Sequence, residues 1–294
     1  MPHEYLYLIS AVALMSVLSL LGTAYNKKNA NEGNITPLYN FLLCSFACVA
    51  WGIIYAFDFS FEPKALLYSL GFGICYATVI VTLTKALAVG PTSITALIQQ
   101  LSLIGATIWG FAFWNTWDIQ KAPLVLSGLA LVIISLILSL YTGKKVEQKI
   151  TVKWFFYAAI LFTANAGCAI FQKSEQIALN GKHGSMFMFF GVLLAAIVCF
   201  VSFLLSSKPN VKKLIKTSWI FPVGAGVCNA VGNLFVVLLA TTSLSPNLIY
   251  PAIAVGGLAI TSIISVFLFK EKLAWWQWVG VVVGAVAVTL LSIN

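Results

Sequence analysis

The sequence predicts an all-α polytopic membrane protein whose ten transmembrane helices form two inverted five-helix repeats. Of its 294 residues, 61% are hydrophobic and 9% are charged, and the mean hydropathy is +0.98. A soluble globular domain carries about 25% charged residues, so this composition excludes a soluble enzyme, a disordered chain and a nucleic-acid-binding protein. The apolar residues fall into ten runs of the length that crosses a bilayer, about 20 residues.

The ten runs are read as helices because they show no alternation of polar and apolar residues, and because only helices and closed barrels can span lipid. The spans are expected near residues 5–25, 37–57, 65–87, 92–114, 122–142, 153–174, 184–206, 218–240, 247–269 and 274–293. Pro37, Pro123 and Pro222 fall at or near span starts, where a missing N–H costs little. Pro251 falls inside the ninth span, so we expect a kink there that serves as a hinge.

The distribution of basic residues predicts the topology. All 17 basic residues are lysines. Thirteen of them belong to the connections after spans 1, 5, 7 and 9 or to the end of span 3, and four belong to the opposite side. Short basic loops stay in the cytoplasm. We therefore expect both termini on the external face of a plasma (inner) membrane.

A polar linker divides the chain near its middle. Residues 143–152 separate a first five-helix repeat, 1–142, from a second, 153–294. Because five is an odd number, two similar halves would face opposite ways across the membrane, which is the inverted-repeat design of many transporters.

Two short motifs add a family resemblance to this pattern. A shift of about 155 residues places Lys85–Ser93 against Ala240–Pro246. The segment Phe267–Leu273, followed by Gln277 and Gly280, resembles the end of an EamA domain of the drug/metabolite transporter superfamily. The turn Ala86–Ser93 is similar to that family's other signature, and Tyr250-Pro251 is similar to its helix proline.

The resemblance implies a ten-helix bundle with a central cavity between the two halves. In the family the cavity is lined mainly by helices 1, 3, 4, 6, 8 and 9, while helices 5 and 10 act as scaffold. The resemblance also implies a transporter.

Polar side chains inside the apolar spans are the candidate substrate-binding residues. Intramembrane polar groups are costly and usually face a cavity or a partner helix. On this ground we single out Gln99, Gln100, Asn229, Asn233, Asn165, Tyr76 and Lys85. Asn229 and Asn233 are spaced i, i+4, so both lie on one helix face. The alternative for the amides is that they form interhelical hydrogen bonds that only stabilise helix packing. The alternative for Lys85 is that its long side chain places the charged amine at the membrane–water interface.

Other residues carry weaker expectations. Asn40 is a secondary candidate for the cavity. Glu175 is expected to stay ionised in a polar mouth at a span end, with no part in energy coupling. Gly280 and Gly284 form a GxxxG pattern, which is expected to pack against span 5 of a monomer; a homodimer through these glycines is the alternative.

The family resemblance, more than these residues, implies secondary transport, by facilitation or exchange, of a small polar metabolite such as an amino acid. A lipid-carrier flippase that uses Lys85 and Lys173 at headgroup depth is one alternative. An integral-membrane lipid enzyme is a weaker one, because the two histidines, His3 and His183, lie in end or loop regions. The expected partners are the substrate and the lipid bilayer, with no nucleic acid, no metal, no cofactor and no catalysis. The six cysteines show no ligand spacing.

Overall fold

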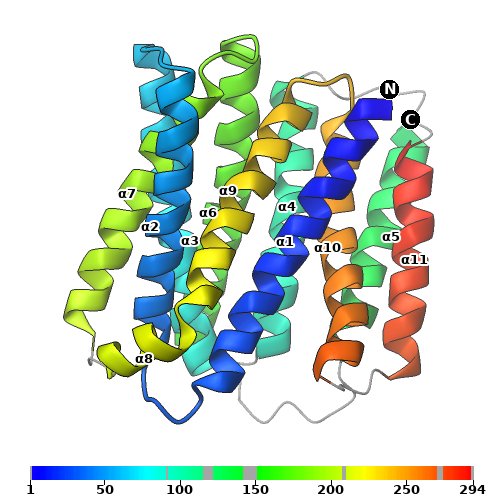
Figure 1. The fold of residues 1–294 in the computed structure, drawn as a ribbon. Helices are drawn as coiled ribbons and strands as arrows, with labels where there is room; N and C mark the ends of the chain where they lie inside the picture. The colour runs from blue at the N-terminus through cyan, green and yellow to red at the C-terminus, as the bar shows by residue number, and fades with distance from the viewer. Residues whose placement is uncertain are drawn as a thin grey trace.

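The computed structural model describes residues 2–90, 92–114, 122–141, 151–206, 210–269 and 274–292, and these residues form an all-helical bundle (Figure 1). The first half holds α1 (Pro2–Lys28), α2 (Thr36–Phe57), α3 (Pro63–Val89), α4 (Thr92–Phe113) and α5 (Ala122–Leu140). The second half holds α6 (Val152–Ala178), α7 (Gly184–Leu205), α8 (Val211–Ser218), α9 (Ile220–Ala240), α10 (Pro246–Phe269) and α11 (Trp275–Ser292).

Within these described residues, all helices except α8 are long and apolar enough to cross a membrane, which gives the ten expected spans. Large apolar side chains in the middle of the spans are exposed on the outside of the bundle, among them Ile9, Ile108 and Val282. A hydrocarbon environment favours such a surface, whereas water does not. The chain is therefore a multi-pass membrane protein, and its first and last helices place both ends of the chain at the same end of the bundle (Figure 1).

The short helix α8 is a feature that the ten-span prediction treats as part of a loop. Lys212, Lys213 and Lys216 lie on it, while Leu214 is buried against the bundle. A short helix with a basic surface and an apolar anchor suits the membrane interface. Together with Lys27 and Lys28 at the end of α1, α8 defines what we call the lysine-rich end; the opposite end, where α1 begins and α11 finishes, we call the terminal end.

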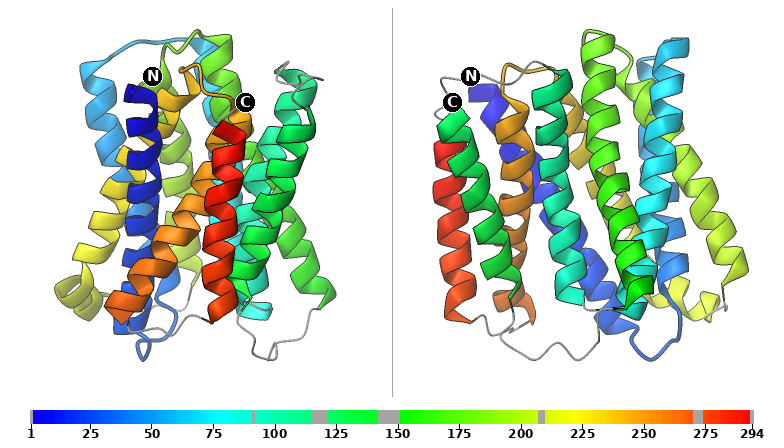
Figure 2. Two further views of the ribbon diagram at one scale, coloured as in Figure 1. Left: turned by 90° about the vertical axis from the view of Figure 1, so that its right-hand side faces the viewer. Right: turned by 180° about the vertical axis from the view of Figure 1, so that it is seen from behind.

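Helices of the first half pack against helices of the second. α1 packs against α9 and α10, and α6 packs against α3 and α4. α2 and α7 contact each other on one flank, and α5 and α11 contact each other on the opposite flank (Figure 2). That the two halves are an inverted repeat stays a prediction.

Small residues let the two halves approach closely on the first flank. The sulfur atoms of Cys44 in α2 and Cys199 in α7 lie 3.8 Å apart. A Cβ atom on Gly226 of α9 would lie 2.7 Å from the carbonyl oxygen of Leu43. Only glycine fits at this contact between the α9 and α2 backbones.

The GxxxG pattern of α11 packs inside the chain, on the second flank. A Cβ atom on Gly280 would lie 2.5 Å from Ser139 Oγ, and one on Gly284 would lie 2.5 Å from Ser135 Oγ. Ser135 donates to the Gly280 carbonyl at 2.7 Å. The side-chain amide of Gln277 accepts from Ala274 N at 2.8 Å and donates to the Ser139 carbonyl at 3.1 Å. Both glycines thus contact α5 of the same chain, as expected for the monomer.

Several expectations fall on residues outside the described part of the chain. These are the linker residues 142–150, Pro91 in the first family-like turn, and residues 270–273 in the second. Pro251 is described and lies inside α10, which continues through it as one helix. Its role as a hinge stays a prediction.

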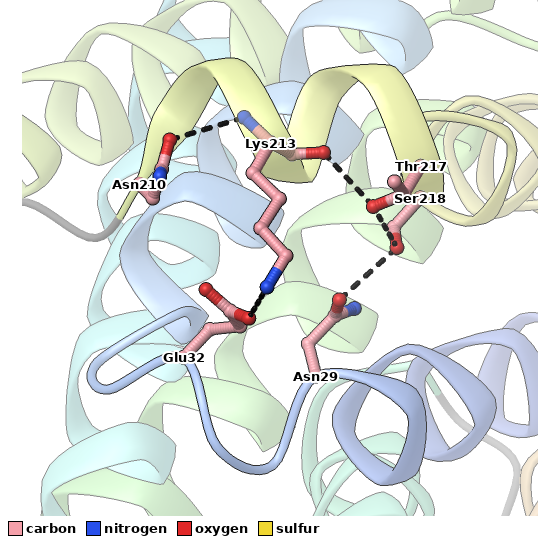
Figure 3. Close-up of polar contacts among 6 residues, drawn as sticks. All are labelled: Asn29, Glu32, Asn210, Lys213, Thr217 and Ser218. Atoms are coloured by element: carbon pink, nitrogen blue, oxygen red, sulfur yellow. Dashed lines mark hydrogen bonds and ion pairs between the residues drawn. The ribbon is translucent and has the colours of Figure 1, made fainter.

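Three contacts join α8 to the last residue of α1 and to the connection that follows it. Figure 3 shows two of them, those of Lys213 and Ser218. Lys213 forms an ion pair with Glu32, and Ser218 Oγ donates to Asn29 Oδ1 at 3.1 Å. Lys28 Nζ donates to the Thr217 carbonyl at 2.6 Å. These contacts join the two halves at the lysine-rich end.

Candidate functional site

A cavity of about 550 Å³ lies between the two halves. Its volume falls within the range of small-molecule sites, about 300–1,000 Å³. Seven helices line it: α1, α2, α3, α4, α6, α9 and α10. The flank helices α5 and α11 do not, which agrees with the scaffold role that the resemblance implies. α2 lines the cavity although the resemblance does not imply it.

Six of the seven predicted binding residues line this cavity. They are Tyr76 from α3, Gln99 and Gln100 from α4, Asn165 from α6, and Asn229 and Asn233 from α9. Residues from both halves therefore meet in one place. That they contact a substrate stays a prediction.

Two of these side chains join helices from different halves. Asn229 Nδ2 donates to the Tyr76 hydroxyl at 3.1 Å, which links α9 to α3. Asn165 Nδ2 donates to the Gln99 carbonyl at 3.1 Å and to Ser102 Oγ at 2.7 Å, which links α6 to α4. These bonds are the interhelical packing contacts that the alternative reading predicted, and the same side chains also face the cavity.

The lining keeps free hydrogen-bonding capacity. Asn229 is 5% exposed, and its Oδ1 has no hydrogen-bond partner among the described residues. The hydroxyl of Tyr39, which also lines the cavity, is buried and lacks a partner there too. The side-chain amides of Gln99 and Gln100 form no hydrogen bond with the described residues. A buried unpaired polar group costs about 1–3 kcal/mol, so Asn229 Oδ1 and the Tyr39 hydroxyl favour a polar ligand. The half-buried amides of Gln99 and Gln100 can bind the same ligand.

Six polar lining residues were missing from the predicted site or ranked low in it. Ser19 lies in α1, Tyr39 and Asn40 lie in the first turns of α2, Gln172 lies in α6, and Tyr250 and Thr261 lie in α10. Gln172 and Asn40 carry the same signal as the predicted amides, a polar group inside an apolar span. Tyr39 and Tyr250 carry a weaker signal than Tyr76, because they lie near the starts of their helices and tyrosine is enriched at membrane interfaces.

The prediction that Lys85 belongs to the site is not supported, because Lys85 does not line the cavity. Its side chain is exposed near the end of α3, with Nζ 5.9 Å from the ring centroid of Tyr157. A long lysine stem near a helix end reaches the interface readily, and a tyrosine ring attracts its charge. The sequence placed Lys85 on the right helix, but it lies on an outward face of that helix.

The expectation that Glu175 sits in a polar mouth in contact with water is wrong. α6 continues to Ala178, so Lys173 and Glu175 lie inside the helix, and Glu175 is 0% exposed. Gln176 Nε2 donates to one carboxylate oxygen of Glu175, and the other oxygen has no partner among the described residues. Lys173 Nζ donates to the Ala240 carbonyl at the end of α9.

Hydrogen bonds also join the later turns of α6 to neighbouring helices. Tyr250 donates its hydroxyl to the Ala169 carbonyl at 3.1 Å, and both residues line the cavity. Trp114, directly after α4, donates its Nε1 hydrogen to Ser174 Oγ at 3.3 Å. Together with the Lys173 contact, these bonds join α6 to α4, α9 and α10.

The cavity extends toward the lysine-rich end. α2 begins at that end, and its lining residues, from Tyr39 to Cys44, start three residues after its first residue. α7, which contacts α2, contributes no lining residue within the described chain. The lining is thus asymmetric on this flank.

Comparison with known proteins identifies the fold of the chain but no family. No family model matches the chain, and no curated protein matches it. Twenty-nine chains of solved structures match, and one of them is described only as "Crystal structure of protein". It is similar with a TM-score of 0.76 and 12% sequence identity over 100% of this chain and 97% of that chain. At this identity the similarity shows that the whole chain shares a fold already seen in a crystal.

Proposed function

We propose that this chain is a secondary transporter that carries a small polar metabolite through the cavity between its two halves. The observation that carries the proposal is the meeting of amide side chains from both halves, Gln99 and Gln100 with Asn229 and Asn233, in one cavity inside the membrane. Polar groups gathered around a cavity at membrane depth are typical of substrate pathways.

The reciprocal packing of the halves supports transport by alternating access. If α6 corresponds to α1, α9 to α3 and α10 to α4, the main contacts between the halves come in matching pairs: α1 packs against α9 and α10 as α6 packs against α3 and α4. Transporters built from two such repeats rock one repeat against the other around a fixed site, which opens to each face of the membrane in turn. The motif resemblance to EamA-type transporters is consistent with this proposal.

The two alternatives lose their specific support. A flippase was expected to use Lys85 and Lys173 at headgroup depth, yet neither lysine lines the cavity. A lipid enzyme needs a cluster of acid–base or metal-binding side chains, and none of the described lining residues is His, Asp or Glu. We therefore propose no catalytic role.

Counterflow in proteoliposomes tests the proposal. Vesicles loaded with an unlabelled metabolite mixture should take up labelled members of the mixture only when the protein is present. Asn229→Ala should abolish most of this uptake, whereas Asn29→Ala should not, because Asn29 is equally buried but lies outside the cavity. Uptake that is absent for every class of metabolite would refute transport.

A further inference from the structure

The chemistry of the cavity lining points to a narrower class of ligand than a polar metabolite. None of the described residues that line it carries a formal charge. Two buried ionisable groups are near it in the sequence of α6, the carboxyl of Glu175 and the amine of Lys173, but neither residue lines the cavity. A zwitterion such as an amino acid would bring two charges into this space without a partner of opposite sign, and the effective penalty is several kcal/mol per ion. The lining therefore favours an uncharged ligand.

The free polar groups of the lining are mostly amides. Gln99 and Gln100 offer untied side-chain amides from α4, and Asn229 offers its unpartnered Oδ1 from α9. An amide presents an acceptor beside two donor hydrogens, all in one plane. Side-chain amides therefore complement the edges of heterocyclic bases, where ring nitrogens and exocyclic groups alternate as acceptors and donors.

Aromatic rings accompany the amides. Phe72 and Tyr76 both line the cavity, with ring centroids 5.6 Å apart and planes inclined by 19°. Tyr39 and Tyr250 line it from α2 and α10. Aromatic side chains provide stacking surfaces for flat nitrogen heterocycles, because every base presents a π-face to such a ring. A sugar, which is uncharged but not flat, gains less from this combination.

We propose that the cavity binds an uncharged planar nitrogen heterocycle of the nucleobase class, held by its edge on the amides and by its faces on the aromatic rings. The cavity of about 550 Å³ has room for a ligand of this size. This inference rests on the proposed function only in naming the ligand as the transported substrate. Binding of the ligand can be measured whether or not the protein transports it.

Calorimetric titration of the purified full-length protein in detergent tests the inference, with adenine, uracil, L-glutamine and D-glucose as separate probes. Adenine or uracil should bind, and L-glutamine and D-glucose should bind at least about tenfold more weakly or not at all. Asn229→Ala and Gln100→Ala should each weaken nucleobase binding about tenfold or more, whereas Asn29→Ala should leave it within about twofold. The melting temperature of each unliganded variant identifies any that has lost its fold. Asn229→Leu, which has a similar side-chain size and no hydrogen-bonding atoms, serves in place of an unfolded Asn229→Ala.

The possible outcomes separate this inference from the proposed function. Failure of both nucleobases to bind, or nucleobase binding that neither variant weakens, overturns the inference whatever else is transported. Nucleobase binding in a protein that transports no nucleobase and no other metabolite supports the inference and refutes the transporter. Transport of L-glutamine without nucleobase binding supports the transporter and overturns the inference.

Discussion

The side-chain amide of Asn229 donates a hydrogen bond to the hydroxyl of Tyr76, 3.1 Å away and 153 residues earlier in the chain. One residue belongs to the second half and the other to the first, and both face the cavity. The bond therefore links α9 to α3 across the site where we expect the substrate. It also leaves the acceptor oxygen of Asn229 without a protein partner.

Replacing either partner separates the structural role from the binding role. Asn229→Ala removes both the bond and the free acceptor, whereas Tyr76→Phe removes only the bond, which is worth about 0.6–2 kcal/mol within a membrane. Asn229→Ala should therefore raise the KM for counterflow more than Tyr76→Phe does, and the two variants should lower thermal stability by similar amounts. Equal effects on KM would show that Asn229 only positions Tyr76.

A matched pair of glycine substitutions tests the close approach of α9 to α2. Gly226→Ala would place a Cβ 2.7 Å from the Leu43 carbonyl oxygen and 2.7 Å from Phe46 Cβ, and overpacking of this kind costs about 1–3 kcal/mol. Gly257→Ala in α10 meets no atom within 4 Å. Alanine is the better helix former by up to about 1 kcal/mol, so this variant should be as stable as the wild type or more stable. Thermal unfolding in detergent measures both, and a fully stable Gly226→Ala would argue against the helix contact described here.

Glu175→Gln tests whether the buried carboxyl takes part in energy coupling. The introduced amide keeps an acceptor for Gln176 and removes a charge that has no ion-pair partner among the described residues, so thermal stability should be equal or higher. Glu175 does not line the cavity. Counterflow should therefore persist without a pH gradient and survive the substitution. Uptake that depends on the proton gradient and disappears in Glu175→Gln would identify a proton-coupled carrier instead.

The lysine distribution predicts the orientation of the bundle. The structure places α8 and the end of α1 at the same end, opposite the start of α1 and the end of α11 (Figure 1). Because the lysine-rich end should face the cytoplasm, a reporter fused after Asn294 should be active outside the cell. A cysteine introduced at Gly143 should react with an impermeant reagent only after the membrane is opened. A cytoplasmic reporter signal would reverse the topology.

Much of the fold could be predicted from hydropathy alone, because a bilayer leaves few choices to an apolar run of 20 residues. The ten spans and the polar side chains of the cavity, such as Gln100 and Asn229, follow from this rule. The short helix α8 was missed because its pattern of lysines around Leu214 belongs to the membrane interface, where hydropathy gives no span.

Which way a side chain points was harder to predict. Lys85 and Tyr76 lie on the same helix, nine residues apart, yet Tyr76 lines the cavity and Lys85 lies outside it. Nine residues are two and a half helical turns, which puts the two side chains on opposite faces. Glu175 was misplaced because the end of α6 depends on its packing against α7 and α9, which one span's composition does not reveal.

The accessibility of Gln100 tests most directly the claim that the cavity is a transport site. In a chain whose six native cysteines are replaced by alanine, Gln100→Cys would be exposed to an impermeant thiol reagent from either side of the membrane in turn. A carrier that alternates predicts reaction from both sides, while the control Val286→Cys, on an outward-facing surface of α11, stays unreactive in lipid. Reaction from neither side, or from one side only under every condition, would contradict alternating access through this cavity.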